Sequence, residues 1–378
     1  MKDIDRQPQV MPADPPAPTG VSKGLPELHD LRVLVIGASF APDSMESHVV
    51  DGLRSLGAVA EYATTALRID ALGTAANAVL YKVTHALWRE PERITERGLL
   101  NQAMHFAPDL ILVLQGNHLS PKTVVELRRR LQVPIVCWCQ DHLGVFGRQY
   151  LLGSEYDVLF LKDRYTQELF SRMIRTMPFV YLPEACNPRV HRPLQLTADD
   201  HRRFGCDVMI YGSIYYYRQA ILQQLGAFDL KIWGSAAGWF VNRLRERRAG
   251  GEVFLDDKVR AVRAARIALN PLHYGEVNAL NARTFELAGC GAFQLVTHKP
   301  VLSEHFTPGA EVEAFQSVDE LVEKLRHYLD HPEQAAEIAL NGQRRAHRDH
   351  TFAARMREIV RVALNRPHSG NPVTVSAP

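Results

Sequence analysis

The feature that most limits the fold of this chain is the regular alternation of short apolar runs with segments of helical periodicity. LRVLVIGASF at 31–40 is a continuous apolar run that ends in Gly-Ala-Ser, as a central strand of a parallel sheet does. SMESHVVDGLRSLG follows it with helical spacing and ends at Gly57. The alternation predicts two doubly wound, Rossmann-like α/β domains that face a cleft. The expected strands lie at 31–40, 59–64, 109–116, 134–141, 156–162 and 179–185, and then at 207–213, 229–234, 267–272, 292–297 and 310–315.

The pattern is interrupted once, at 186–206. This segment is polar, contains two prolines and shows neither the helical nor the strand periodicity. We interpret this segment as the linker between the domains, because 378 residues suit two domains of ordinary size. The expected parts are a disordered tail (1–29), an N-terminal domain (30–185), the linker (186–206), a C-terminal domain (207–350), a final helix (351–365) and a second disordered tail (366–378).

Composition excludes several classes of protein. Hydrophobic residues make up 46% and charged residues 23%, which is typical of a globular protein. The 44 basic and 42 acidic residues leave a net charge of +2, so no global field attracts nucleic acid. No apolar run approaches the roughly 18 residues of a membrane span, and the Pro-rich N-terminus lacks the apolar core of a signal peptide. We therefore expect a cytoplasmic protein without a transmembrane segment.

The five cysteines do not form a pattern that indicates a disulfide framework or a metal site. Their number is odd and they are scattered, and there is no C-x-x-C pair. Cys137 and Cys139 alternate along one expected strand, so we interpret them as buried thiols. We expect no metal.

The segment NPLHYGEVNALNARTFELAGCGAFQLVT at 270–297 carries the strongest functional signal. It reads as the end of a strand, a short loop, a helix that begins near Asn278, and a second strand. Asn278, Asn281, Arg283 and Glu286 lie where the first strand passes into the helix, and ligands bind at the carboxyl ends of strands in such sheets. A carboxylate such as Glu286 can accept hydrogen bonds from both hydroxyls of a ribose. The pattern predicts the donor site of a glycosyltransferase, although the asparagines also fit helix caps and Glu286 an exposed helix position.

A diphosphate needs backbone N–H groups at the start of a helix and a cation. The strand DVMIYGS ends in Gly212 and Ser213, Arg218 lies in the first turns of the next helix, and Gly234 follows the strand after it. These residues are candidates for phosphate binding, and a tight turn with a surface arginine is the alternative. Lys258, on a polar helical stretch, is a lesser candidate and is expected to be solvated.

From about Phe179 to Arg357 the chain resembles the CgeB-like (spore-maturation) branch of the group-1 glycosyltransferases, which have the GT-B fold. The matching pieces, in order, are YLPEACNPRVHRP, DVMIYGSIYYYRQAILQQL, LKIWG, IALNPLHYGEVNALNARTFELAGCGAFQLV, and the C-terminal run from EHFTPGAEVEAF to TFAAR. The N-terminal half agrees only through PIVCWCQDH, which is similar to the family's Trp-x-x-Asp strand end.

The resemblance implies donor binding in the C-terminal domain, acceptor binding in the N-terminal domain, and a last helix that crosses back to the first domain after Thr351. Many related retaining enzymes carry two glutamates eight positions apart. Glu286 fits the second, but Asn278 stands at the first, which leaves the stereochemical outcome open. The resemblance also implies that the leaving diphosphate is stabilised by cationic side chains and helix N-termini, without a metal. Arg218 and Arg283 are the candidates for this role.

An inverting enzyme also needs a general base near the acceptor hydroxyl. Asp141 and His142 are the first candidates because they directly follow an apolar strand, with Asp43, His48 and His118 as lesser ones. Ser39 and Phe40, after the first strand, are expected to face the acceptor. The expected partners are a nucleotide sugar, with a UDP-sugar as the favoured donor, and an unidentified acceptor. A nucleotide-sugar 2-epimerase and a non-catalytic GT-B binding protein are the alternatives.

Overall fold

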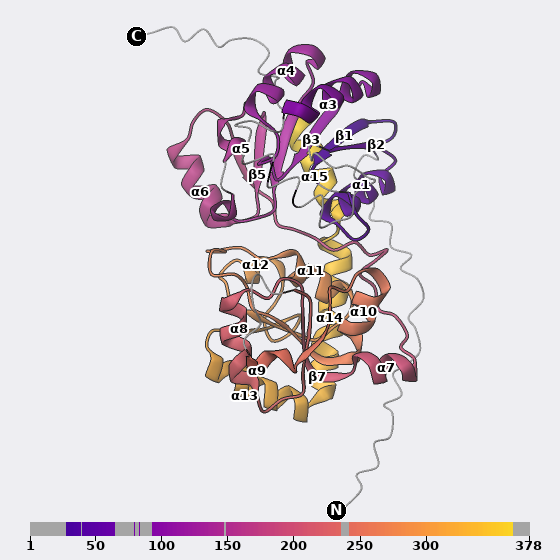
Figure 1. Cartoon of the computed structure of the whole chain (residues 1–378), viewed down its shortest axis with the longest axis vertical. Coiled ribbons are helices and arrows are strands. Elements are labelled where there is room, and N and C mark those ends of the chain that lie inside the picture. The colour runs from indigo at the N-terminus through magenta and orange to yellow at the C-terminus, as the bar shows by residue number, and fades with distance from the viewer. Residues whose placement is uncertain are drawn as a thin grey trace, which may run out of the picture.

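The computed structural model describes residues 28–38, 40–64, 79, 83, 93–146, 149–235 and 242–365. These residues form two parallel six-stranded sheets, one in each of two domains (Figure 1). The first sheet has the order β2-β1-β3-β4-β5-β6 and the second the order β12-β11-β10-β7-β8-β9. The prediction of two doubly wound α/β domains is confirmed.

The strands of the N-terminal sheet are β1 (Arg32–Gly37), β2 (Val59–Thr64), β3 (Leu110–Leu114), β4 (Ile135–Cys139), β5 (Val158–Leu161) and β6 (Phe179–Tyr181). Its helices are α1 (Met45–Ser55), α3 (Arg93–Phe106), α4 (Pro121–Leu131), η1 (Leu143–Val145), α5 (Tyr150–Gly153) and α6 (Arg164–Met173). Alternate residues of β1 enter different cores. Val33 and Val35 pack against α1, whereas Leu34 and Ile36 pack on the opposite face, which α3 and α4 cover. A strand buried on both faces must be continuously apolar, which explains the run at 31–40.

The strands of the C-terminal sheet are β7 (Cys206–Tyr211), β8 (Leu230–Trp233), β9 (Arg248–Gly250), β10 (Ala265–Asn270), β11 (Gln294–Thr297) and β12 (Glu313–Phe315). Its helices are α7 (Ala198–Phe204), α8 (Tyr216–Leu222), η2 (Gln223–Leu225), α9 (Asn242–Arg245), α10 (Leu255–Ala264), α11 (Ala282–Gly289), α12 (Leu302–His305), α13 (Val318–Asp330) and α14 (Pro332–Asp349). Serine, threonine or asparagine side chains cap several helices, as Asn281 does at α11.

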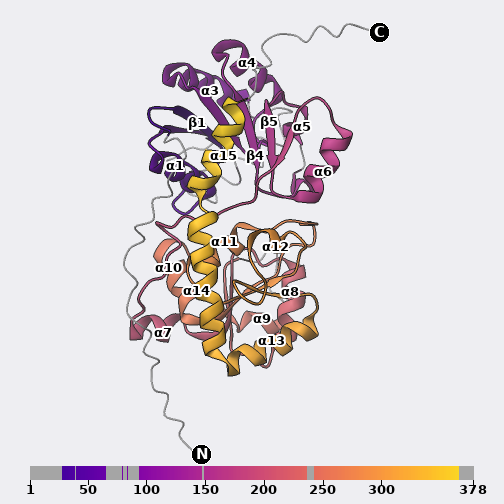
Figure 2. The same ribbon diagram turned by 180° about the vertical axis from the view of Figure 1, so that it is seen from behind.

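The last helix, α15 (Phe352–Leu364), leaves the C-terminal domain directly after α14 and lies on the N-terminal domain (Figure 2). Phe352, Met356 and Ile359 enter the same core as Val33 and Val35. The helix approaches α1 closely at Gly52, where a Cβ atom would lie 3.0 Å from the backbone of Phe352. The chain therefore joins the two domains twice, once between β6 and β7 and once between α14 and α15.

The structure corrects three details. Residues 186–206 are not free of regular structure, because Thr197 and Asp200 form a capping box that begins α7. The helix expected to begin near Asn278 begins at Ala282, after its cap Asn281. Strand β9 (Arg248–Gly250) was not among the expected strands and follows α9, which ends at Arg245.

Ser39 and the predicted tails, apart from Leu28 and His29, lie outside the described residues. Among the described residues, none of the helices combines the length and the apolar character needed to cross a bilayer.

Candidate functional site

Several of the residues expected to bind a donor lie at the point where the order of the second sheet reverses. β7 and β10 are neighbours there, and their carboxyl ends carry Gly212 and Pro271. Gly212 (φ 93°) and Gly234 (φ 136°) both adopt backbone conformations that favour glycine. A Cβ atom on Gly234 would collide with the carbonyl of Gly212, and one on Gly212 would collide with the guanidinium of Arg283. The structure thus brings three predicted residues together at the topological switch point, where ligands bind in this class of sheet.

Arg218 and Arg283 lie near each other at this switch point, and neither has a carboxylate partner among the described residues. Arg218 is 5% exposed and donates from Nε to Pro271 O (3.0 Å) and from Nη1 to the carbonyl of Ser213 (2.7 Å). The guanidinium of Arg283 lies 4.8 Å from the ring centroid of Tyr211, and its Nε makes no hydrogen bond in the described part of the chain. Burial, together with the charge of Arg283, lowers the pKa of Arg218 to about 9. Two neighbouring cations that lack an anion form a site for an anionic ligand.

Glu286 lies one turn after Arg283 on α11, and its side chain is 15% exposed. Its Oε2 accepts a hydrogen bond from Tyr211 (2.6 Å) and lies 3.4 Å from Lys258 Nζ. Burial alone would raise the pKa of Glu286, but the charge of Lys258 and the contacts with His191 and Tyr211 lower it to about 2. Glu286 is therefore an ionised acceptor, and it is held by protein groups rather than lying free on the helix surface.

Lys258 corrects an expectation, because it is 4% exposed and not solvated. Its Nζ donates to Asp43 Oδ1 (2.9 Å) of the N-terminal domain, and Asp43 Oδ2 accepts from the backbone of Leu255 (2.8 Å). Burial would raise the pKa of Asp43, but hydrogen bonds to His191 and His48 and the charge of Lys258 hold it far below its usual range. The candidate donor site is thus connected to the opposite domain through one ammonium group.

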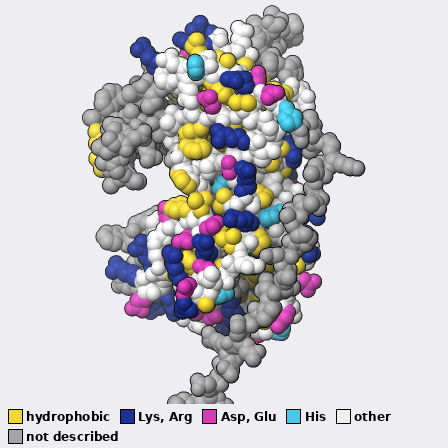
Figure 3. Space-filling view, turned by 90° about the vertical axis from the view of Figure 1, so that its right-hand side faces the viewer, with side chains coloured by type: hydrophobic (Ala, Val, Ile, Leu, Met, Phe, Trp, Pro, Cys, Tyr) yellow, Lys and Arg dark blue, Asp and Glu magenta, His cyan; other side chains and the backbone are white. Residues whose placement is uncertain are grey.

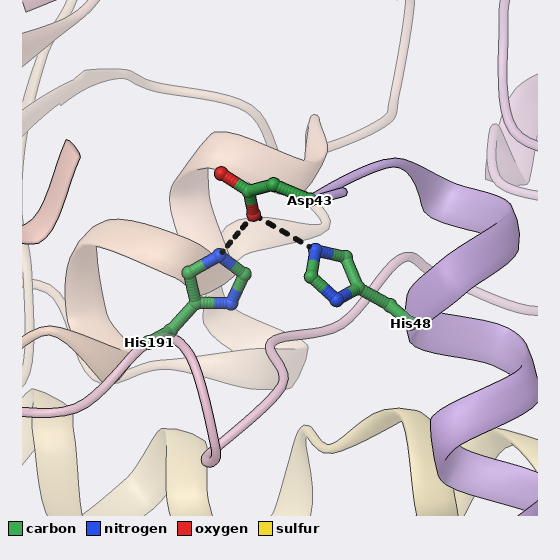
Figure 4. Close-up of side chains that lie close together, drawn as sticks. All are labelled: Asp43, His48 and His191. Atoms are coloured by element: carbon green, nitrogen blue, oxygen red, sulfur yellow. Dashed lines mark hydrogen bonds and ion pairs between the residues drawn. The ribbon is translucent and has the colours of Figure 1, made fainter. Parts of the chain in front are cut away.

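Asp43, His48 and His191 also lie close enough to share a metal ion (Figure 4). His48 Nε2 is 3.1 Å and His191 Nε2 is 3.7 Å from Asp43 Oδ1. Two observations disfavour a metal here. The backbone N–H of Asn187 donates to Nδ1 of His191 (2.9 Å), so only Nε2 of that ring is left to bind a metal. In addition, Lys258 Nζ lies 2.9 Å from that Nε2 and supplies the positive charge itself.

A second buried charged cluster lies between the domains and was not predicted. Lys162 Nζ, after β5, donates to Glu276 Oε1 (2.7 Å) and lies 3.8 Å from Glu184 Oε2. Burial raises the pKa of Glu184 to about 8, although the charge of Lys162 opposes this. Glu276 and Glu184 were both inside segments quoted for their pattern, but nothing in that pattern distinguished them from surface glutamates. On the face shown in Figure 3, basic, acidic and histidine side chains lie close together where the two domains meet.

The two candidate bases stand beside this cluster. Asp141 is exposed after β4, and its Oδ2 lies 3.4 Å from the amide of Gln115. The ring of His142 stacks on that of His273 in the C-terminal domain, with centroids 4.5 Å apart. Asp141 is thus open to a substrate, whereas one face of His142 is covered.

The two asparagines have structural partners. Asn278 joins the domains, because its N–H donates to Asp163 (3.2 Å), its carbonyl accepts from Arg164 (3.1 Å) and its side chain accepts from Val301 (2.8 Å). Asn281 caps α11 and exchanges hydrogen bonds with Asn270 (3.0 and 3.1 Å). These contacts occupy the backbone and the side-chain oxygen of Asn278 and both polar atoms of the Asn281 side chain.

The chain has the GT-B fold of glycosyltransferases, with two Rossmann-like domains and a candidate site at the switch point of the second sheet. Residues 218–361 match the family described as "Glycosyl transferase-like". No curated protein matches the chain.

Solved structures share the fold at low sequence identity. Sucrose-phosphate synthase from Thermosynechococcus elongatus is 14% identical, with a TM-score of 0.63 over 88% of this chain and 99% of that one. HepE of Anabaena in complex with UDP-glucose is 14% identical, with a TM-score of 0.62 over 88% and 99%. A putative UDP-N-acetylglucosamine 2-epimerase from Listeria monocytogenes is 11% identical, with a TM-score of 0.52 over 88% and 95%.

Proposed function

We propose that this protein is a glycosyltransferase that moves a hexose from a nucleotide sugar, with a UDP-sugar as the favoured donor, to an acceptor bound between the domains. The observation that carries the proposal is the pair of Arg218 and Arg283, which lie at the switch point of the sheet without a carboxylate partner in the described part of the chain. The glycosyltransferase-like match over 218–361 and the UDP-glucose complex of the HepE structure support it.

In this proposal the diphosphate lies against Gly212, Ser213, Arg218, Gly234 and Arg283, and Glu286 accepts hydrogen bonds from the ribose hydroxyls. Glu286 suits this role because its low pKa keeps it ionised. Asn278 and Asn281 shape the loop and the helix start that carry these groups, through the contacts described above. No step requires a metal, because the arginines supply the charge that stabilises the leaving group.

The reaction breaks the bond between the anomeric carbon and the diphosphate oxygen and forms a bond to an acceptor hydroxyl oxygen. We assign to Asp141, which is exposed, the role of the general base that accepts the proton of that hydroxyl. We assign to His142 a role in orienting the sugar. The proposal also includes membership of the CgeB-like branch and a cytoplasmic location, as expected from the sequence.

A thermal-shift screen with UDP, GDP, dTDP and their glucose conjugates tests the nucleotide preference, because a ligand that binds only the folded state raises the melting temperature. We expect UDP and UDP-glucose to give the largest shifts. Absence of a shift with every nucleotide, confirmed by calorimetry, contradicts donor binding.

The fold shared with the Listeria structure makes a 2-epimerase the second candidate. The two activities differ when the donor is incubated without an acceptor, because an epimerase converts the sugar to its isomer or releases it. A glycosyltransferase leaves the donor sugar unchanged in configuration, and proton NMR of the incubated donor distinguishes the outcomes.

A further inference from the structure

Five aromatic side chains form a connected series where the two domains meet, and we call it the aromatic series. Its members are His142, Tyr215, Tyr217, His273 and Tyr274. The ring of His273 stacks on His142 (4.5 Å between centroids) and on Tyr274 (4.1 Å), and meets Tyr215 edge-on at 4.7 Å. The ring of Tyr274 meets that of Tyr217 edge-on at 5.6 Å.

One end of the aromatic series lies against Arg218 of the candidate phosphate site, and the other end is open to solvent. The guanidinium of Arg218 lies 4.5 Å from the ring centroid of Tyr215. At the outer end, Tyr274 is 70% exposed and Tyr217 is 39% exposed. Large aromatic side chains that remain this exposed beside a site are typical of binding surfaces.

Both domains contribute to the series. His142 comes from the N-terminal domain, next to Asp141. Tyr215 caps α8 after β7, Tyr217 lies in the first turn of α8, and His273 and Tyr274 lie in the loop after β10. A molecule that lies along the series therefore reaches from solvent to Asp141 on one side and to the candidate phosphate site on the other.

The chemistry of the series favours a neutral, hydroxyl-rich ligand. The tyrosines have an apolar ring face and a polar tip, so they can pack against the C–H face of a sugar ring and exchange hydrogen bonds with its hydroxyls. Burial and the neighbouring His142 lower the pKa of His273, which keeps that ring uncharged.

We propose that the aromatic series is the acceptor subsite and that the acceptor is a neutral carbohydrate whose sugar ring packs on Tyr274 and Tyr217. This inference rests on the proposed function, because it identifies the acceptor class of the same site.

The test uses the full-length protein saturated with UDP, applied to an array of immobilised neutral oligosaccharides, and then calorimetry with the best-binding free oligosaccharide. Tyr274→Ser removes the ring and keeps a hydroxyl, whereas Tyr274→Phe keeps the ring. We expect Tyr274→Ser and Tyr217→Ser each to weaken saccharide affinity at least fivefold and Tyr274→Phe to weaken it less. The matched control is Tyr165→Ser on α6, an exposed tyrosine outside the aromatic series, which should leave saccharide affinity within twofold.

UDP calorimetry on the same samples separates the two proposals. If the wild-type protein does not bind UDP, the proposed function is wrong. If the protein binds UDP normally but binds no saccharide, or if Tyr274→Ser leaves saccharide affinity unchanged, the carbohydrate subsite is wrong and the donor site remains.

Discussion

Lys258 of α10 donates a hydrogen bond from Nζ to Asp43 Oδ1 at 2.9 Å, across the junction of the two domains. The same ammonium lies 3.4 Å from Glu286 Oε2 in the candidate donor site. Burial would lower the pKa of Lys258, but the charges of Glu286 and Asp43 raise it instead, so the group stays charged. The residue that we assign to the ribose is therefore linked, through one buried cation, to the N-terminal domain, which also carries the candidate base Asp141.

Replacement of Lys258 by Met is expected to destabilise the protein by about 3–5 kcal/mol, because it leaves the buried carboxylates of Asp43 and Glu286 without their cation. Urea unfolding measures this loss. The double variant with Asp43→Asn should recover part of it, since one of the two unpaired charges is then absent.

Arg361→Met is the matched control, because Arg361 pairs with Glu358 on the exposed surface of α15. Such surface pairs contribute at most about 1 kcal/mol, so the control should stay close to wild type. If Lys258→Met behaves like the control, the buried cluster does not support the fold.

The residues that join the domains show what the sequence could not predict. The apolar strands were predictable because burial on both faces demands continuous apolar runs, and predicted strand 59–64 coincides with β2 (Val59–Thr64). Strand β9 was missed because it has three residues, is partly exposed and lies among arginines. Asp43 and Lys258 are 215 positions apart, so no local spacing connects them.

Within the candidate site, the sequence predicted residues best where the backbone geometry requires a particular residue type. Gly212 and Gly234 need positive φ and close approach, and both follow strands, which sequence shows directly. Asn278 holds a loop through its contacts with Asp163 and Val301, and such an asparagine looks the same in a sequence as one that binds a ligand.

Replacement of Arg283 by Met should weaken UDP binding by tenfold or more and leave uridine binding within twofold, because only UDP carries the diphosphate. Loss of a hydrogen bond to a charged group costs about 1.5–3 kcal/mol, which sets this range. Calorimetry with both ligands measures the difference. Arg283 is preferable to Arg218 for this purpose, because Arg218 also holds the carbonyls of Ser213 and Pro271. An equal loss for uridine and UDP would place Arg283 away from the phosphates.

Replacement of Glu286 by Gln should lower the affinity for uridine and for UDP to the same degree, by tenfold or more, because both ligands carry the ribose. Glutamine keeps the shape of the side chain and one acceptor for Tyr211, so the fold should tolerate it. Glu337→Gln on the exposed side of α14 is the control and should bind both ligands as wild type does. Unchanged uridine affinity in Glu286→Gln would reject the ribose assignment.

Replacement of Asp141 by Asn should lower kcat about 100-fold or more with UDP affinity unchanged, because the amide cannot take the acceptor proton. The measurement is sugar transfer to the saccharide identified on the array, compared with UDP calorimetry. Retention of turnover with normal donor binding would exclude Asp141 as the base.

The last prediction concerns Glu184, whose carboxyl lies between the domains beside Lys162. Burial raises its pKa from 4.5 to about 8 in the folded protein. Between these values the native state keeps a proton that the unfolded chain has released, so the free energy of unfolding falls as pH rises through this range. Glu184→Gln removes this dependence.

The free energy of unfolding of Glu184→Gln relative to wild type should therefore increase by about 1.4 kcal/mol for each pH unit from pH 5 to pH 8. Above pH 8 the difference should level off. Urea unfolding of both proteins at unit pH intervals provides the comparison. Lys162 keeps its bond to Glu276 in the variant, so the buried cation stays paired. A difference that does not change with pH, as expected for the control Glu337→Gln, would show that Glu184 is ionised in the native state at neutral pH.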